Sequence, residues 1–194
     1  MSDVNQFHND KKFVFLGHRG VGKTSLIMRY TEKTFVDNYY PTIEDVHDKI
    51  VDLSGTKYKF TILDTSGQDE FSMLNSHHTI GTDVFVLVFS VASKKSFEMV
   101  NSIKDKILDQ TGLDHVPMLL VGCKSDLENM RQVPKEDAQN LASSLNCQYI
   151  ECSAKDEVNI DKVFEMSLKE ILGHDISLSS NKSDSKSGSA CTIM

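Results

Sequence analysis

The sequence predicts an α/β fold: a mostly parallel, doubly wound sheet of six strands, with one antiparallel hairpin at its edge and helices on both faces. Two apolar runs, residues 84–91 (VFVLVFSV) and 118–123 (MLLVGC), have the near-continuous hydrophobicity of central strands covered on both sides. Segments with helical spacing of apolar residues alternate with such runs, as in parallel sheets. A hairpin signal, Ser-Gly-Thr at residues 54–56, predicts the antiparallel edge.

Each strand is expected from its local pattern. Residues 11–17 (KKFVFLG) read as a short buried strand that runs into a glycine loop. The two segments on either side of the hairpin signal alternate loosely between apolar and polar side chains. The expected strands are residues 11–17, 46–53, 57–63, 84–91, 118–123 and 148–151.

Four helices are expected, at residues 24–31, 96–109, 134–145 and 157–172. Each carries an apolar face, formed in the last helix by side chains such as Val163, Phe164 and Leu168. Pro134 suits the first turn of the third helix. Gly173 is expected to end the last helix, because glycine readily adopts the left-handed conformation of a helix cap.

These elements predict one domain at residues 11–172, after a short flexible N-terminus at residues 1–10. Residues 173–194 are predicted to be a disordered tail, because the segment SLSSNKSDSKSGSA is rich in serine and poor in apolar side chains.

A cytosolic protein is expected from the sequence. The chain has 194 residues, of which 39% are hydrophobic, and a net charge of −7, which argues against broad nucleic-acid binding because that requires a basic surface. No apolar run approaches the roughly 20 residues needed to span a bilayer, and the N-terminus lacks the apolar core of a signal peptide. The four cysteines match no zinc or CxxC pattern, so free thiols are expected.

Residues 17–24 (GHRGVGKT) match the phosphate-binding pattern G-x-x-x-x-G-K-[ST], between a strand and a helix. Consecutive backbone N–H groups can wrap an anion there, provided that side chains do not obstruct its approach. Lys23 is expected to reach the β- and γ-phosphates, and the Thr24 hydroxyl to bind Mg²⁺. The predicted phosphate-binding residues are Gly17, His18, Arg19, Gly20, Val21, Gly22, Lys23 and Thr24.

Two further motifs predict a guanine nucleotide, GTP or GDP. In the Lys124-x-Asp126 motif, which follows a buried strand, the carboxylate can accept hydrogen bonds from guanine N1–H and the 2-amino group, a donor pair that adenine lacks. The segment Ser153-Ala154-Lys155 follows the last strand and offers a backbone N–H to the guanine carbonyl. Each tripeptide is weak alone, but their order at strand ends favours guanine.

The metal ion and the hydrolytic water have candidates in two other segments. Asp64 follows the second hairpin strand and can hold a water on Mg²⁺, while Gly67 can offer its N–H to the γ-phosphate. Gln68 is expected to orient the attacking water. Upstream, the Thr42 hydroxyl can ligate Mg²⁺ when its loop closes, and Phe35 can cover the guanine ring. The predicted catalytic residues are Gln68, Lys23 and Thr42.

These motifs, in this order, resemble the Ras family of small GTPases over residues 11–172, a P-loop G domain, and the stretch PTIED matches the effector loop of the Ras subfamily. The resemblance implies a switch that hydrolyses GTP to GDP, with exchange factors and GTPase activators setting its state. It implies a switch I at residues 35–47, a switch II at residues 64–79, and a protein that works mainly as a monomer with transient partners. The implied effector contacts are Tyr39, Tyr40, Pro41, Thr42, Ile43, Glu44 and Asp45.

Arg19 departs from the family, whose members carry glycine beside the γ-phosphate. A long side chain is expected to crowd Gln68 and an activator's arginine finger, which is worth about 10³–10⁵ in rate in this family. Slow hydrolysis that resists activators is therefore predicted. Two alternatives stay open: Arg19 neutralises phosphate charge itself, or an unusual activator accommodates it.

Cys123 stands where the family has the asparagine that binds guanine N7 and ties the base loop to the phosphate loop. A thiol is a weak donor, so the loss is expected to cost about 1–3 kcal/mol and to speed nucleotide release. Tyr40 replaces an acidic residue of the family, and residues 46–48 differ as well, which leaves the effector's identity open.

The last four residues, Cys191-Thr-Ile-Met194, form a C-a-a-X box, and the final methionine favours a farnesyl group on Cys191. One lipid chain binds membranes only marginally, and the tail has no polybasic patch to reinforce it. Reversible residence at the cytoplasmic face of the plasma membrane is expected, with a cytosolic pool.

Three functions are weighed. The first is a signalling GTPase that recruits effectors in its GTP state, which the intact Gln68 and Thr42 favour. The second is a hydrolysis-poor, GTP-bound scaffold tethered to a membrane, which Arg19 and Cys123 favour. The third is a P-loop kinase or ATPase, which the Lys124-x-Asp126 motif opposes.

Overall fold

The computed structural model describes residues 9–37, 41–53, 55–67 and 74–183, with side chains as far as residue 173. Four residues singled out by the sequence lie outside this part of the chain: Tyr39, Tyr40, Gln68 and Cys191. Their predicted roles stay predictions.

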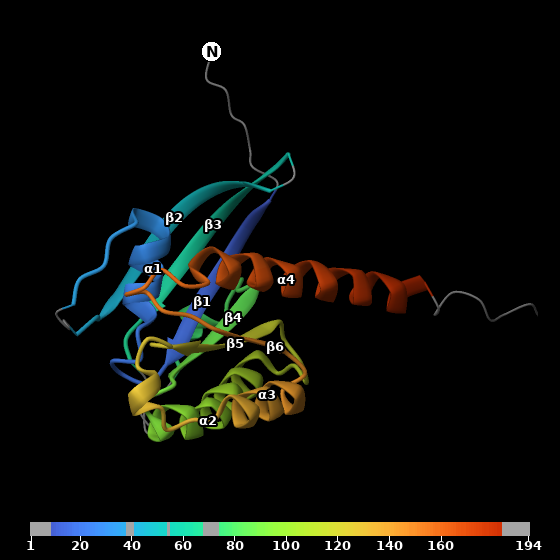
Figure 1. Cartoon of the computed structure of the whole chain (residues 1–194). Helices are drawn as coiled ribbons and strands as arrows, with labels where there is room; N and C mark the ends of the chain where they lie inside the picture. The colour runs from blue at the N-terminus through green and yellow to red at the C-terminus, as the bar shows by residue number, and fades with distance from the viewer. Residues whose placement is uncertain (1–8, 38–40, 54, 68–73, 184–194) are drawn as a thin grey trace, which may run out of the picture.

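The fold is a six-stranded sheet with the strand order β2-β3-β1-β4-β5-β6 (Figure 1). Its strands are β1 (Asp10–Gly17), β2 (Glu44–Leu53), β3 (Thr56–Thr65), β4 (Val84–Ser90), β5 (Met118–Cys123) and β6 (Gln148–Glu151). Only β2 and β3 pair antiparallel, and the other neighbours are parallel. The predicted fold class, including the antiparallel edge hairpin, is confirmed.

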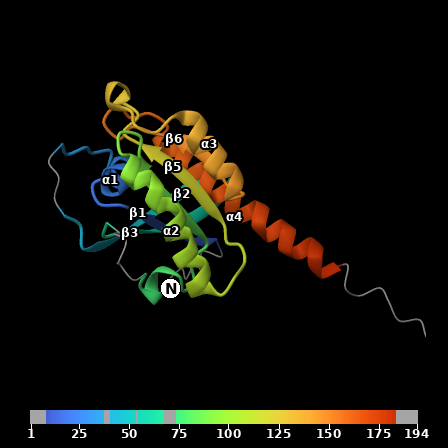
Figure 2. The ribbon, with the colours of Figure 1, turned by 90° about the horizontal axis from the view of Figure 1, so that it is seen from below.

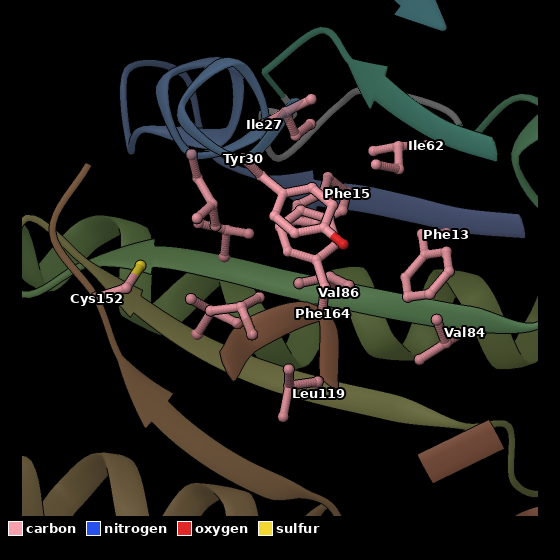
Figure 3. Packing of buried hydrophobic residues seen from close by; sticks show 14 of the residues in the cluster. Phe13, Phe15, Ile27, Tyr30, Ile62, Val84, Val86, Leu119, Cys152 and Phe164 are labelled. Atoms are coloured by element: carbon pink, nitrogen blue, oxygen red, sulfur yellow. The ribbon is translucent and has the colours of Figure 1, made fainter. Parts of the chain in front are cut away.

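Helices cover both faces of the sheet, as predicted (Figures 1 and 2). One face packs against α1 (Lys23–Glu32) and α4 (Ile160–Ser183), and the other against α2 (Lys94–Thr111) and α3 (Lys135–Ser144). Under α1 and α4 the core is aromatic: Tyr30 stacks on Phe164 with ring centroids 3.6 Å apart, beside Phe13 and Phe15 (Figure 3). This packing fixes α1, and with it the loop that precedes α1, against the sheet.

Most element boundaries lie within a few residues of those predicted, and the largest correction concerns α4. The helix begins at Ile160, because Glu157 and Asn159 have left-handed backbones, and it continues past Gly173 to Ser183. Gly173 does not take the left-handed conformation of a cap, and glycine costs only about 1 kcal/mol within a helix. The expected helix end is therefore wrong, and residues 174–183 are helical where the sequence predicts a disordered tail.

The parallel strands bring distant loops to one edge of the sheet. The carboxyl ends of β1, β3, β5 and β6 lead into residues 17–24, 64–67, 123–126 and 152–155, respectively. In doubly wound sheets, ligands bind at the carboxyl ends of the strands. The binding crevice lies where the strand order reverses, because the connections of the neighbouring strands there lie on opposite faces of the sheet. The fold thus gathers the predicted nucleotide motifs at one site.

Candidate nucleotide and magnesium site

The phosphate loop joins β1 to α1 and needs its glycines. A Cβ on Gly17 would lie 2.1 Å from the carbonyl oxygen of Val88 on the neighbouring strand, which no side chain tolerates. Gly22, immediately before α1, has φ 112°, a left-handed conformation that favours glycine. The loop therefore approaches β4 closely and turns sharply into the N-terminus of α1, where free backbone N–H groups favour an anion.

Lys23 is buried, and its ammonium group lies over this loop. The Nζ atom donates to the carbonyl oxygens of Gly17 at 3.0 Å and His18 at 3.2 Å. Burial lowers the pKa of Lys23 to about 8, although the nearby Asp64 carboxylate favours the charged form. A partly desolvated ammonium held in place in this way is suited to a phosphate group.

Three oxygen-bearing side chains from separate elements converge beside Lys23. The Thr24 hydroxyl donates to Asp64 Oδ2 at 2.6 Å, and the Thr24 and Thr42 hydroxyls lie 2.8 Å apart. The other Asp64 oxygen, Oδ1, is buried and has no hydrogen-bond partner among the described residues. Burial raises the pKa of Asp64, against the opposing effect of the hydrogen bond from Thr24. Hydroxyl and carboxylate oxygens are ligands that Mg²⁺ prefers, so this set fits the ion.

Gly67 lies directly against Arg19. A Cβ on Gly67 would stand 2.3 Å from Arg19 Cγ and 2.4 Å from Arg19 Cα, so only glycine fits there. The predicted start of switch II therefore meets the phosphate loop at the position where this chain carries its large side chain, which is exposed.

The two base motifs are joined by the side chain of Ser153. Ser153 Oγ donates to Asp126 Oδ1 at 2.7 Å and accepts from the backbone N–H of Asp156 at 3.0 Å. The backbone N–H of Ser125 donates to the Cys152 carbonyl at 3.1 Å. Asp126 is thereby held beside the 153–155 loop, and Lys124 turns the chain with a left-handed φ of 63°.

Cys123 is buried between the base motifs and the phosphate loop. Its Sγ lies 3.4 Å from Cys152 Sγ, and a Cβ on Gly22 would come within 3.5 Å of Cys123 Cβ. The hydrogen bond to Cys123 and burial raise the pKa of the Cys152 thiol, and both cysteines are free. The thiol that replaces the family's asparagine therefore contacts another thiol.

Comparison with known proteins decides the family. The family model described as Ras family matches residues 12–173.

The chain belongs to the Ras family.

Its curated relatives include the small monomeric GTPase RhbA of Aspergillus fumigatus, which is 43% identical over 95% of this chain and 96% of the relative. The GTP-binding protein rhb1 of Schizosaccharomyces pombe is also 43% identical, over 94% of this chain and 96% of the relative. The human GTP-binding protein Rheb is 38% identical over 95% of this chain and 97% of the Rheb chain. Ras-family proteins bind guanine nucleotide and hydrolyse GTP, so the P-loop kinase or ATPase alternative is set aside.

Within the described part of the predicted effector contacts, residues 41–45, the side chains are exposed except for Thr42, which turns inward. Ile43 is 87% exposed, and Glu44 Oε2 lies 2.8 Å from the Nε2 of His78, a buried side chain in the 3₁₀ turn Ser76–His78. Pro41 and Asp45 are exposed. The contact between Glu44 and His78 joins the segments predicted as switch I and switch II, and it was not foreseen from the sequence.

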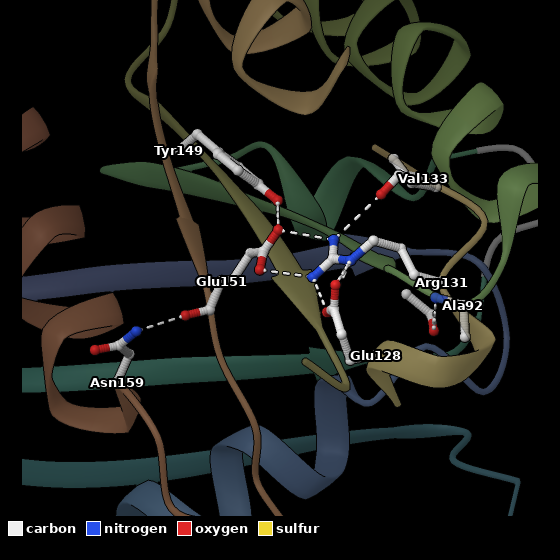
Figure 4. A network of polar contacts seen from close by, with 8 residues as sticks. Ala92, Glu128, Arg131, Val133, Tyr149, Glu151 and Asn159 are labelled. Carbon is white, nitrogen blue, oxygen red and sulfur yellow. Dashed lines mark hydrogen bonds and ion pairs between the residues drawn. The ribbon is translucent and has the colours of Figure 1, made fainter. Parts of the chain in front are cut away.

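Behind the base motifs lies an ion-pair network that no sequence motif indicates (Figure 4). Arg131 donates to both carboxylate oxygens of Glu151, at 3.0 Å each, and to Glu128 at 2.7 Å. The Tyr149 hydroxyl donates to Glu151 at 2.7 Å. Glu151 directly precedes Cys152, so the network supports the start of the 153–155 loop without reaching the nucleotide motifs themselves. Single charged residues at no regular spacing gave no signal for it.

Proposed function

We propose that this Ras-family GTPase is a signalling switch that binds GTP or GDP with Mg²⁺ at the site described above. The convergence of Thr24, Thr42 and Asp64 carries the proposal, because Thr42 of the predicted switch I contacts Thr24, which in turn binds Asp64. Closure of this loop is expected to bring Thr42 to the ion. Thr24 and Thr42 would hold Mg²⁺ directly and Asp64 through a water, and the ion supplies positive charge to the β- and γ-phosphate oxygens.

The remaining residues act on the nucleotide. Lys23 binds the β- and γ-phosphates, and Gln68 orients the water that attacks the γ-phosphate. Asp126 accepts from guanine, with Lys124 beside it, and the loop Ser153, Ala154 and Lys155 donates a backbone N–H to the guanine carbonyl. Phe35, half-buried beneath the Arg29 guanidinium at 5.6 Å, covers the base.

We propose further that hydrolysis is slow and resists activators. The contact between Gly67 and Arg19 supports this, because it puts the base of the Arg19 side chain next to the segment that leads into Gln68. An arginine finger and Gln68 need the same space beside the γ-phosphate. A chain that hydrolyses GTP slowly spends longer bound to GTP and to its effectors.

Single-turnover hydrolysis tests this proposal. The protein and its Arg19→Gly variant are loaded with GTP and followed with and without a Ras-type activator. We expect weak stimulation of the natural chain and strong stimulation of the variant. Strong stimulation of the natural chain would overturn the role given to Arg19. If the variant too stays slow with the activator, the alternative function, a GTP-bound scaffold, is favoured.

Membrane attachment is a separate proposal. Among the residues that the structure describes, no helix is long and apolar enough to cross a membrane. A farnesyl group on Cys191 would attach the protein reversibly, since a single lipid chain binds weakly and the tail is not polybasic. Flotation of the lipidated protein with phosphatidylcholine vesicles, against Cys191→Ser, tests this; equal flotation of both would contradict it.

A further inference from the structure

Arg29 is a residue of α1 that no motif predicts, and its guanidinium reaches two segments of the nucleotide site. Its Nε donates to the Ala154 carbonyl at 2.8 Å, and Nη2 donates to the Lys155 carbonyl at 3.4 Å. Its Nη1 donates to the Lys33 carbonyl at 3.2 Å, and its Cζ lies 5.6 Å from the centre of the Phe35 ring. One side chain thus joins the helix of the phosphate loop to the 153–155 loop and to the residue expected to cover the base.

The bond to Ala154 fixes the direction of a particular N–H group. The carbonyl of Ala154 and the N–H of Lys155 belong to one planar trans peptide, in which they point in opposite directions. Holding the carbonyl toward Arg29 therefore turns the Lys155 N–H away from α1. The bond to the Lys155 carbonyl fixes the following peptide unit in the same way.

The other hydrogen bonds of the loop act elsewhere. Within the described residues, Ser153 exchanges backbone hydrogen bonds with Val158, at 3.1 and 2.9 Å, and its side chain binds Asp126 and the N–H of Asp156. These bonds fasten the two ends of the loop. The peptide between Ala154 and Lys155 is held by Arg29.

We infer that Arg29 is a positioning residue for guanine selectivity, which holds the 153–155 loop so that its backbone N–H meets the guanine carbonyl. This inference rests on the proposed role of that loop. It also gives the chain a second connection between base loop and phosphate-loop helix, in addition to the one that passes through residue 123. Arginine suits the role because its rigid fork of donors holds several carbonyl oxygens at once.

The inference is tested with two nucleotides that differ only at the guanine carbonyl, GDP and 6-thio-GDP, since sulfur is a weak acceptor. Dissociation constants for both are measured for the natural chain, Arg29→Met, Arg29→Lys and Lys33→Gln. Methionine keeps an unbranched apolar stem without donors, and lysine restores a single donor. Lys33→Gln is the matched control, because it removes the exposed ion pair of Lys33 with Asp161 at 3.4 Å from the same end of α1.

We expect the natural chain and Lys33→Gln to prefer GDP over 6-thio-GDP by about two- to twelvefold, the value of one hydrogen bond. Arg29→Met is expected to lose most of that preference, with Arg29→Lys in between. Equal weakening of both nucleotides by Arg29→Met would mean that the side chain acts through Phe35 or through folding, and would overturn the inference. Unchanged preference in both Arg29 variants would overturn it as well.

Failure of the underlying proposal gives a different pattern. If the natural chain itself does not distinguish GDP from 6-thio-GDP, the 153–155 loop does not read the carbonyl, and the assignment fails before Arg29 is varied. If the natural chain also fails to distinguish GDP from ADP, the proposed guanine site as a whole is wrong.

Discussion

The two ends of the nucleotide site are built differently. At the phosphate end, the groups expected to meet the ligand contact one another: Thr24 binds Asp64 and Thr42. At the base end, Asp126 and the 153–155 loop are braced by side chains behind them, Ser153 and Arg29. We therefore expect the proposed Mg²⁺ ion and the phosphates to replace those internal contacts when the nucleotide binds. The base end is organised in advance, and it is also where the asparagine of the family is missing.

The largest expected effect tests the base end. Asp126→Ala removes the carboxylate that we propose accepts two charge-assisted hydrogen bonds from guanine, each worth about 1.5–3 kcal/mol. GDP affinity is expected to fall by about 10²–10⁴-fold, while the dependence of binding on Mg²⁺ stays unchanged. Equilibrium titration with a fluorescent GDP, with and without a chelator, measures both. A loss below tenfold would mean that preorganisation of the base end contributes little.

A smaller effect tests the phosphate end. Thr24→Ala removes one proposed Mg²⁺ ligand and the hydrogen-bond partner of Asp64 Oδ2. We expect GDP to bind about ten- to 150-fold more weakly at saturating Mg²⁺, from the loss of one interaction with a charged group, and the benefit of adding Mg²⁺ to shrink. Preference for GDP over 6-thio-GDP is expected to survive, because Arg29 and the base loops are untouched. Loss of that preference would show that the two ends are not separable.

Cys123→Asn supplies the asparagine that the base end lacks. We expect GDP release to slow by about five- to 150-fold, which corresponds to one or two regained hydrogen bonds worth about 1–3 kcal/mol. Release of labelled GDP from preloaded protein measures it. Cys152→Ala is the control, since it removes the thiol that contacts Cys123 at 3.4 Å without adding a donor. An unchanged rate of GDP release in Cys123→Asn would show that the contacts of Arg29 and Ser153, which hold the base loops in place, already limit GDP release.

Short sequence patterns correctly predicted the strands and the phosphate loop, which depend on residues close together in the chain. The apolar runs gave the strands, and the spacing of Gly17, Gly22, Lys23 and Thr24 gave the phosphate loop, because each signal lies within a few residues. The end of α4 was missed because one glycine, Gly173, costs too little to stop a helix.

Bracing contacts were missed for another reason. Arg29 and Ala154 are 125 positions apart, and the Arg131–Glu151 and Ser153–Asp126 contacts span 20 and 27 positions. A single arginine or glutamate on a helix or strand has many possible partners, and only the packed sheet chooses one. The preorganised end of the site is therefore the end that the sequence reveals least.

The smallest expected effect concerns the outermost brace, Glu151. Burial raises the pKa of Glu151, but hydrogen bonds from Arg131 and Tyr149 outweigh it and hold the pKa below the ordinary value of 4.5. The charged form is thus favoured in the folded protein. Its stabilising contribution is present above pH 4.5 and is lost as the pH falls through the lower pKa of the folded state.

Glu151→Gln is expected to lower the free energy of unfolding by about 1 kcal/mol or less near neutral pH, since the network is partly exposed. The difference in free energy of unfolding between Glu151→Gln and the natural chain should shrink as the pH falls below about 4.5. The GDP affinity at pH 7 should change less than twofold, because substitutions at distant sites have small, independent effects. Urea unfolding of the GDP-bound protein across pH 3.5–7 measures the gap, with the exposed Glu136→Gln as control. A gap that widens in acid would contradict the favoured charged form, and a large loss of GDP affinity would place Glu151 inside the preorganised base end rather than behind it.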